Sequence, residues 1–406
     1  MTQETGQSAG PARMFGPEML ANPYPVYNLL RSMDPVHWHE AINGWVLTRY
    51  ADVAAMLRSP NVSSDRATVA RARGPEEFQE LYTFRANSML NSDPPKHTRL
   101  RTLVSKAFTP AAVERLAPII QKVTDEAVDA ALARGGMEIM HDLAYPLPVT
   151  VIAHMLGVPP EDRDRFKKWS DDITATAGNI MANLTPDHYR QAIRSTRELT
   201  AYFHKVVTER RSQPRDDLLT AMAKAEEQGD RLSEPELFAN AVLLLNAGHE
   251  TTTNLIGNGA WALLRFPDQK RRLREDPSLA NTAVEELLRF DSPVQFTSRV
   301  LKEDVTVGGK ALKAGQLVLL LLGAANRDPA QFAEPDRLDV GRQDNKHVAF
   351  GMGPHFCLGA PLARLEGRIV LQTLLRRLPG LRLDGPEPEY RDNFNLRGLK
   401  ALKVAF

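Results

Sequence analysis

The chain has 406 residues, of which 43% are hydrophobic and 25% are charged, so it is long enough to bury a large core. Its formal net charge is +1, and the absence of a basic run argues against nucleic acid as an electrostatic partner. A single cysteine gives no sign of an oxidising compartment. No repeat, linker or abrupt change of composition divides the chain, so we expect one domain over 1–406, with 1–14 as a flexible segment.

The N-terminal residues 1–12 are polar, with glycine and proline among them. They lack the basic and apolar segments of a signal peptide or membrane anchor. The longest apolar run, Leu317 to Leu322, is far shorter than the roughly 20 residues that span a bilayer. We therefore expect a cytoplasmic protein without a membrane anchor.

Two β-hairpins are predicted from turn dipeptides that lie between short strand-like segments. They are Val36–Glu40 and Trp45–Thr48 around Asn43-Gly44, and Val305–Val307 and Lys310–Leu312 around Gly308-Gly309. Between the hairpins, from about residue 97 to 290, leucine and alanine recur at spacings of three and four residues, which predicts mostly helix. The fold class predicted is mainly α with small β-sheets.

One long helix is predicted to lie at the centre of the protein. Ser233-Glu234-Pro235-Glu236 is typical of a capping box with proline in the first turn, and the helix should run to about Leu264, before Pro267. Apolar residues occupy nearly all of its faces, which predicts burial. Within it, the segment 247–252 reads Ala-Gly-His-Glu-Thr-Thr. Glycine in mid-helix costs about 1 kcal/mol against alanine, and an unpaired buried carboxylate costs more.

Thr251 can return its hydroxyl to the carbonyl of Ala247, one turn back, which bends a helix locally. Such distortions often mark functional sites. From these residues alone, two interpretations carry equal weight. The segment is either a structural kink with a satisfied polar cluster or a functional site.

The single cysteine, Cys357, lies in Phe-Gly-Met-Gly-Pro-His-Phe-Cys-Leu-Gly, residues 350–359. The glycines allow sharp turns that bring amide N–H groups close to the sulfur, and such a cradle stabilises a thiolate. One cysteine excludes zinc and iron–sulfur sites built on paired cysteines of this chain. The remaining possibilities are a nucleophile, or the only protein ligand of a metal whose other ligands come from a cofactor. Haem with an axial thiolate fits the second case.

The spacing of Phe350, Gly353, Cys357 and Gly359 resembles the haem-binding loop of the cytochrome P-450 monooxygenases. The resemblance runs in order from about residue 15 to the C-terminus, and the N-terminal segment is similar to the soluble bacterial type. It implies the P-450 fold, with a long central helix over haem b. It also implies Cys357 as the axial ligand of the iron, with Phe350, Gly351 and Gly359 beside the cofactor.

The central-helix segment resembles the family's pattern of small residue, glycine, any residue, acid, threonine, and threonine or serine. The resemblance implies that Thr251 and Glu250 supply protons for oxygen activation, with Glu250 as the relay from solvent. His249 should point to another face, so we expect an ordinary hydrogen-bonded histidine there.

Haem propionates require cations. His97 and Arg101 lie at i and i+4 after Pro94-Pro95 and therefore share one face of a helix. The resemblance implies that they bind the propionates together with Arg299 and His355. A planar guanidinium suits carboxylate recognition.

A second group of charges is Glu286 and Arg289, at i and i+3. They resemble the family's Glu-x-x-Arg pair, whose third member we expect to be Arg337. The three would form a buried network that fixes the fold behind the cysteine loop, and its loss should abolish haem incorporation.

The resemblance also suggests which segments line the substrate pocket: 82–90, 243–247, 294–297 and 395–396. They are mostly apolar, which favours a hydrophobic small molecule as substrate. Asn246 is expected to bind either a substrate oxygen or the kinked backbone. The pocket residues expected are Leu243, Asn246, Ala247, Val294, Phe296 and Leu396.

The function implied is a haem-thiolate monooxygenase that inserts one atom of dioxygen by hydroxylation or epoxidation. No reductase module follows Gly359, so NAD(P)H electrons should arrive from a ferredoxin or flavodoxin with its reductase. Three cations near the cysteine loop either form a positive patch for this electron donor or are ordinary solvated side chains: Lys346, Arg364 and Arg368. A monomer is expected. The alternatives are a peroxide-driven peroxygenase, a non-catalytic haem-binding or sensing protein and, more remotely, a cysteine hydrolase.

Overall fold

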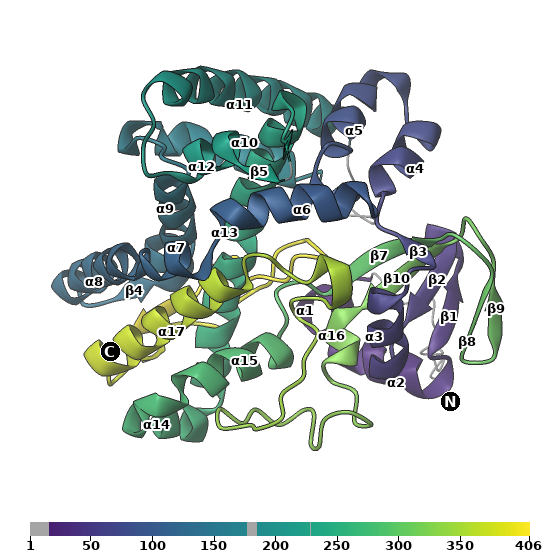
Figure 1. The fold of residues 1–406 in the computed structure, drawn as a ribbon. Coiled ribbons are helices and arrows are strands. Elements are labelled where there is room, and N and C mark those ends of the chain that lie inside the picture. The colour runs from purple at the N-terminus through teal and green to yellow at the C-terminus, as the bar shows by residue number, and fades with distance from the viewer. Residues whose placement is uncertain (1–15, 177–184, 228) are drawn as a thin grey trace.

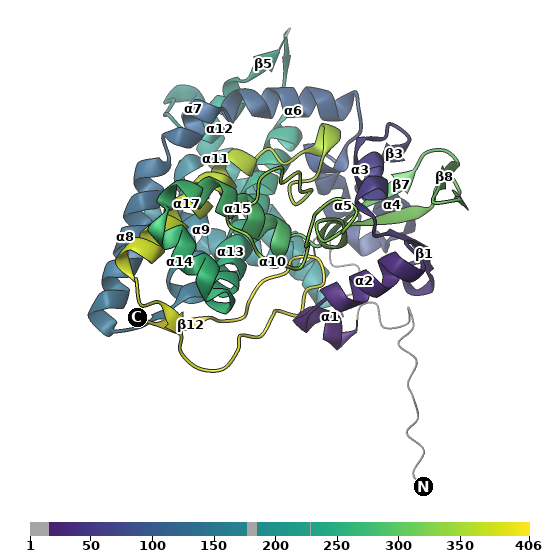
Figure 2. The same cartoon turned by 90° about the horizontal axis from the view of Figure 1, so that it is seen from below.

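The computed structural model describes residues 16–176, 185–227 and 229–406. Figures 1 and 2 show a mainly helical molecule from two directions. A short π-helix at Met140–Ala144 lies between a short strand and the helix that begins at Pro146. The α-helices are α1 Pro17–Ala21, α2 Tyr24–Met33, α3 Tyr50–Arg58, α4 Arg66–Arg73, α5 Gln79–Arg85, α6 Lys96–Ala107, α7 Pro110–Glu114, α8 Ala117–Arg134, α9 Pro146–Met155, α10 Arg163–Thr174, α11 Pro186–Ser212, α12 Leu218–Lys224, α13 Glu234–Arg265, α14 Pro267–Glu275, α15 Ala280–Phe290, α16 Leu322–Ala325 and α17 Ala360–Arg377.

The strands are short and form small sheets. They are β1 Val36–His39, β2 Gly44–Leu47, β3 Val62–Ser63, β4 Met137–Glu138, β5 Glu226–Glu227, β6 Asp230–Arg231, β7 Phe296–Leu301, β8 Val305–Val307, β9 Lys310–Leu312, β10 Leu317–Leu321, β11 Arg382–Leu383 and β12 Lys403–Ala405. A five-stranded sheet has the order β1-β2-β10-β7-β3, in which only β2 and β10 pair in parallel. A three-stranded sheet has the order β11-β12-β4, and β5-β6 and β8-β9 are separate hairpins.

The five-stranded sheet and the β8-β9 hairpin lie on one side of the molecule with α1, α2 and α3, and the longer helices fill the other side (Figures 1 and 2). Both predicted hairpins are confirmed. β1 pairs with β2 across a turn in which Asn43 has a left-handed φ of 46°. β8 pairs with β9, and Gly308 and Gly309 take φ of 56° and 79°, values that glycine adopts at little cost.

The central helix α13 has 32 residues and is the longest described helix. Its N-terminus carries the predicted capping box, in which the backbone N–H of Ser233 donates to the carboxylate of Glu236 at 3.0 Å. It ends at Arg265, two residues before Pro267. Leu245 and Trp261 belong to the main hydrophobic core, and α13 contacts α9, α10, α11, α15 and α17. The predicted burial of this helix is confirmed.

Helix α17 starts directly after the cysteine loop and packs against α13 and α15. Gly367 allows this close approach, because a Cβ at that position would lie 3.3 Å from side-chain atoms of Leu255 and Val284. Leu365 and Leu374 of α17 enter the same core as α13. The cysteine loop is therefore held at a fixed position relative to the central helix.

Candidate haem site

The cysteine loop turns sharply before Cys357. Gly351 and Gly353 have φ of 69° and 71°, in the left-handed region that favours glycine. A Cβ at Gly353 would also lie only 2.8 Å from the carbonyl oxygen of Leu57 on α3. The N–H of Cys357 donates to the carbonyl of Phe350 at 2.9 Å, which closes the loop. Both glycines are thus required by the backbone path.

The Cys357 sulfur lies at the N-terminus of α17. The backbone N–H groups of Gly359 and Ala360 donate to it, as expected for a thiolate cradle. Burial raises the pKa of the thiol, and these two amides with the Arg101 guanidinium oppose that effect. Among the described residues, no three His, Cys, Asp or Glu side chains gather to hold a metal ion. A metal at Cys357 would therefore take its other ligands from outside the described part of the chain.

The predicted propionate residues gather beside the loop. The rings of His97 and His355 lie 4.0 Å apart between centroids, and the guanidinium of Arg101 donates to the carbonyl of Phe356 at 2.7 Å. Burial, followed by the charges of His97 and Arg299, lowers the pKa of His355 to about 3. Burial also lowers the pKa of His97. Both imidazoles are consequently neutral at pH 7.

Arg299 is 5% exposed and donates to the carbonyl of Ser298 at 2.8 Å and to the hydroxyl of Thr297 at 3.1 Å. Burial and the nearby Arg66 lower its pKa to about 10. Arg66, on α4, also lowers the pKa of His355. Sequence reasoning missed this cation. It arrives there because β3 pairs with β7, the strand that carries Arg299, and no local spacing signals that pairing.

The predicted relay segment lies in α13. The hydroxyl of Thr251 donates to the carbonyl of Ala247 at 2.8 Å, the bond expected from the sequence. Glu250 has a side chain 14% exposed, with one carboxylate oxygen 3.7 Å from the guanidinium of Arg391. Burial raises the pKa of Glu250, the Arg391 cation opposes the rise, and Asp171 adds to it.

Asp171, an exposed residue of α10, is near enough to Glu250 for its charge to raise the pKa of that carboxyl. It accepts a hydrogen bond from the hydroxyl of Tyr145 at 3.0 Å, and the ammonium of Lys167 lies 4.5 Å from the Tyr145 ring centroid. Burial raises the pKa of Asp171. Neither Arg391 nor Asp171 was predicted, because they come from the C-terminal loop and from α10, and no pattern joins them to Glu250.

His249 and Asn246 both turn to α10. Nδ1 of His249 lies 3.2 Å from the Ser170 hydroxyl, which donates to Oδ1 of Asn246 at 2.8 Å. Burial lowers the pKa of His249 to about 4. The hydrogen bond predicted for His249 is present at Nδ1, whereas its buried Nε2 has no partner within the described residues. The amide oxygen of Asn246 binds the Ser170 side chain, a partner that was not among the two expected from the sequence, and a contact of Asn246 with substrate stays a prediction.

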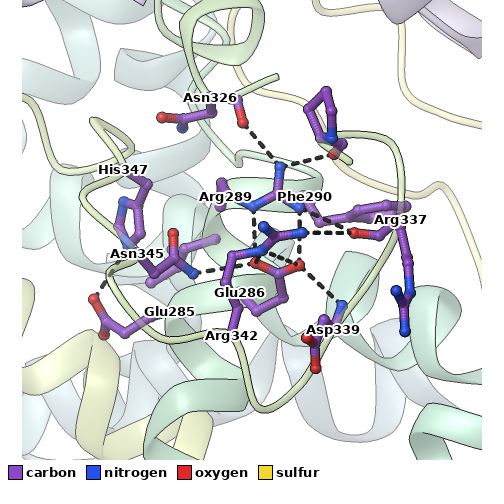
Figure 3. A network of polar contacts seen from close by, with 12 residues as sticks. Glu285, Glu286, Arg289, Phe290, Asn326, Arg337, Asp339, Arg342, Asn345 and His347 are labelled. Atoms are coloured by element: carbon purple, nitrogen blue, oxygen red, sulfur yellow. Dashed lines mark hydrogen bonds and ion pairs between the residues drawn. The ribbon is translucent and has the colours of Figure 1, made fainter. Parts of the chain in front are cut away.

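The charge network behind the loop is shown in Figure 3. Glu286 and Arg289 are fully buried and form two hydrogen bonds of 2.8 Å with each other. The third member is Arg342, whose Nε lies 3.0 and 3.2 Å from the two carboxylate oxygens of Glu286. The prediction of Arg337 was wrong. Its side chain is 59% exposed, extends away from Glu286 and pairs with Glu334, and only its backbone carbonyl joins the network (Figure 3).

Residues 60–399 match the sequence model of the family described as Cytochrome P450. The chain belongs to the cytochrome P450 family. Within the described part of the chain, no helix of this P450 combines the length and the apolar character needed to cross a bilayer.

Similar proteins cover almost the whole of this P450. The vitamin D(3) 25-hydroxylase of Pseudonocardia autotrophica is 43% identical over 398 residues, which are 96% of this chain and 95% of that protein. The P450 monooxygenase PikC of Streptomyces venezuelae is 42% identical over 399 residues, 96% and 92% of the two chains. The crystal structure of P450BioI, in complex with an acyl carrier protein ligated to hexadec-9Z-enoic acid, has a TM-score of 0.90 and 38% identity, covering 96% of this chain and 99% of that one.

This P450 is therefore a haem-thiolate monooxygenase with haem b as cofactor and dioxygen as co-substrate, and its NAD(P)H electrons come through partner proteins. The residues present fit the cofactor. A sulfur that accepts two amide hydrogen bonds suits an iron ligand, and the cluster of Arg66, Arg101 and Arg299 suits two carboxylates. Nε2 of His97 is buried and has no hydrogen-bond partner within the described residues, as expected for a donor reserved for a ligand.

The predicted pocket segments come together only in part. An isolated antiparallel bridge joins Val294 to Leu396, and Ala247 is exposed. Leu243 is half-buried against the main core. Phe296 is 3% exposed and packs with Tyr27 under the N-terminal helices, so its placement in the pocket was wrong. In strand β7 alternate side chains face opposite ways, and the resemblance did not fix which ones face the pocket.

Proposed function

We propose that Cys357 is the axial ligand of the haem iron and that this P450 oxidises hydrophobic small molecules on the α13 side of the cofactor. The observation that carries the proposal is the sulfur of Cys357, which accepts the amides of Gly359 and Ala360 beside a cation cluster. Haem bound there supplies the activation of dioxygen, which a thiolate ligand favours, and the transfer of one oxygen atom to substrate.

The propionates, in this proposal, are held by the guanidinium groups of Arg101, Arg299 and Arg66. His97 and His355 add neutral imidazole donors, because their lowered pKa values keep them uncharged at pH 7. Guanidinium groups can bind carboxylate oxygens through two N–H groups at once, and neutral imidazoles add donors without adding repulsion between positive charges.

Proton supply is assigned to Glu250 and Thr251. The raised pKa of Glu250 favours a carboxyl that holds a proton at its oxygen, and Arg391 keeps that proton removable. The Thr251 hydroxyl must rotate away from the Ala247 carbonyl to donate elsewhere. The Thr251 residue is half-buried, and its hydrogen bond to Ala247 is exposed. Asp171 and Tyr145 are the proposed route from solvent.

The proposed electron donor is a ferredoxin or flavodoxin with its reductase. The predicted positive patch is weaker than the sequence suggested, because Arg364 forms a two-pronged pair with Glu285 at 2.6 and 2.9 Å and Lys346 pairs with Asp344 at 2.8 Å. If charge steers the donor, raising ionic strength slows reduction of the haem. Salt-independent reduction would remove these cations from the interface. A monomer and a cytoplasmic location stay predictions.

Two measurements test the assignment. Reduced protein with carbon monoxide should show the red-shifted Soret band of thiolate ligation, and Cys357→Ala should lose both that band and oxygenase activity. An imidazole-type spectrum in the unmodified protein would refute Cys357 as ligand. The substrate is sought by screening hydrophobic compounds for a low-spin to high-spin shift of the ferric haem.

The relay assignment has its own test. Thr251→Ala should retain haem and substrate binding but divert reducing equivalents to hydrogen peroxide. Unchanged coupling of electrons to product would remove Thr251 from the proton path. Full activity with peroxide and none with a reductase would favour the peroxygenase alternative, and binding without turnover under either condition would favour a sensor.

A further inference from the structure

Three polar side chains meet where α15, α17 and the segment before the cysteine loop come together. Arg364 of α17 donates to both carboxylate oxygens of Glu285 on α15, at 2.6 and 2.9 Å. Nε2 of His347, which precedes the loop, lies 3.1 Å from the second of these oxygens. Figure 3 shows the side chains of His347 and Glu285 facing each other, next to the network around Glu286. Glu285 therefore ties both neighbouring segments to α15.

The carboxylate of Glu285 is charged in the folded protein. Nδ1 of His347 accepts from the backbone N–H of Ala349 at 3.2 Å, which leaves Nε2 as the nitrogen that donates to Glu285. Burial raises the pKa of Glu285, but the hydrogen bonds from Arg364 and His347 outweigh burial and lower that pKa to about 2. Arg364 and Glu285 are thus a full pair of opposite charges at pH 7.

The cation of this pair lies against the cysteine loop. The guanidinium carbon of Arg364 is 4.7 Å from the centroid of the Phe350 ring, and the carbonyl of Phe350 accepts the N–H of Cys357 at 2.9 Å. Burial raises the pKa of the Cys357 thiol, and Arg364 is one of the groups that oppose the rise. Glu285 is not among the groups that act most on the sulfur. The cation is therefore the member of the pair with the stronger effect on Cys357.

Charges near the sulfur affect the uptake of an electron by the cofactor. One-electron reduction adds one negative charge to the haem and its thiolate ligand. A nearby cation favours the reduced state, and a nearby anion disfavours it. Because Arg364 and Glu285 are paired, their effects partly cancel. The side chain of Arg364 is 39% exposed, so water screens its charge and the remaining effect is moderate.

We propose that Arg364 and Glu285 together set the reduction potential of the haem, with the cation raising it and the carboxylate limiting the rise. The inference rests on the proposed ligation of the iron by Cys357. It gives Arg364 a role in positioning charge behind the cysteine loop, which differs from docking of the electron donor. The electron still comes from the partner protein, and no bond or proton changes at the pair.

The test is potentiometric titration of purified holoenzymes with small-molecule mediators, in the absence of any donor protein. Glu285→Gln leaves the cation without its counter-charge and should favour reduction about fivefold. Arg364→Gln leaves the carboxylate without its counter-charge and should disfavour reduction about fivefold. At 59 mV for a tenfold change in a one-electron equilibrium, each shift is about 40 mV, and the two are opposite in sign. The variant with both substitutions carries neither charge and should titrate close to the parent.

Two control variants separate charge from structure. Arg364→Lys keeps the positive charge but loses the two-pronged geometry, so its potential should stay close to that of the parent. Arg377→Gln is the matched control on the same helix, because Arg377 also pairs with carboxylates, those of Asp125 and Asp129. It lies about 20 Å further along α17 and should leave the potential unchanged.

The sign of the two shifts decides the outcome. A purely structural pair would loosen the loop in either single variant and move both potentials in the same direction. Shifts of the same sign, or no shift, in variants that keep the thiolate-type spectrum with carbon monoxide would overturn this inference and leave the ligation by Cys357 intact. An imidazole-type spectrum in the unmodified protein would overturn both.

Discussion

Glu366 carries a pH-dependent free-energy cost that can be measured. Its side chain lies in α17 at the interface with α13 and is 1% exposed. Burial raises its pKa to about 8, and the neighbouring Thr252 hydroxyl only partly opposes the rise. The folded protein therefore holds a neutral carboxyl at pH 7, whereas the unfolded chain, with the ordinary pKa of 4.5, does not.

Between these two pKa values the folded state binds one proton more than the unfolded state, so the free energy of unfolding falls as pH rises. The slope is about 1.4 kcal/mol per pH unit, or about 4 kcal/mol between pH 5 and pH 8. Glu366→Gln replaces the carboxyl by a neutral side chain of the same shape and removes this titration. The stability of the variant relative to the parent should therefore increase by about 4 kcal/mol over the same range.

The assay is urea unfolding of both holoenzymes, with equal haem content, at several values of pH from 5 to 8, followed by circular dichroism. Glu126→Gln, an exposed carboxylate on α8, is the control and should follow the parent at every pH. Parallel stability curves for Glu366→Gln and the parent would mean that Glu366 ionises normally in the folded state, and the reasoning from burial would be refuted.

Three further outcomes are expected. Arg342→Ala should lower the free energy of unfolding by about 3 kcal/mol and should also lower the haem content, whereas Arg337→Ala should change the free energy of unfolding by less than about 0.5 kcal/mol. Equal effects of the two variants in urea unfolding would contradict the network around Glu286. Gly353→Ala should reduce haem incorporation more than Gly351→Ala, because a Cβ at 353 would lie 2.8 Å from the Leu57 carbonyl oxygen, whereas a Cβ at 351 would meet its nearest atom at 3.7 Å. The pyridine haemochrome assay of purified protein measures the difference. Arg391→Gln should move the alkaline limb of the pH profile of product formation to higher pH. The proton-supplying Glu250 loses the cation that lowers its pKa and so keeps its proton to higher pH, while Arg391→Lys should restore the parent profile. An unmoved limb would exclude the arginine from proton supply.

The parts of the fold that local chemistry determines could be predicted from the sequence. The capping box at Ser233 and the dipeptide Asn43-Gly44 each specify a backbone geometry within a few residues, and both are found where expected. The Thr251 bond to Ala247 is equally local, since one helical turn separates the two groups.

Residues brought together by packing could not be predicted in the same way. Arg337 and Arg342 lie five positions apart in an irregular segment, and without a helix or strand period no pattern tells which guanidinium turns inward. Arg66 reaches the propionate residues only through the pairing of β3 with β7, whose strands are far apart in the chain. Asn246 finds Ser170 on α10, a partner that the periodicity of α13 cannot reveal.

The cation cluster beside the cysteine loop has a consequence for how this protein matures. Arg66, Arg101 and Arg299 come from three distant parts of the chain, and folding brings their like charges together. If this cluster binds the propionates as proposed, the two cofactor carboxylates relieve that repulsion. The free energy of cofactor binding then adds to the free energy of folding, as in proteins whose ligand binds only the native state. The chain without cofactor should accordingly gain more from added salt than the loaded enzyme, which makes cofactor supply and ionic strength joint determinants of how much native protein a cell accumulates.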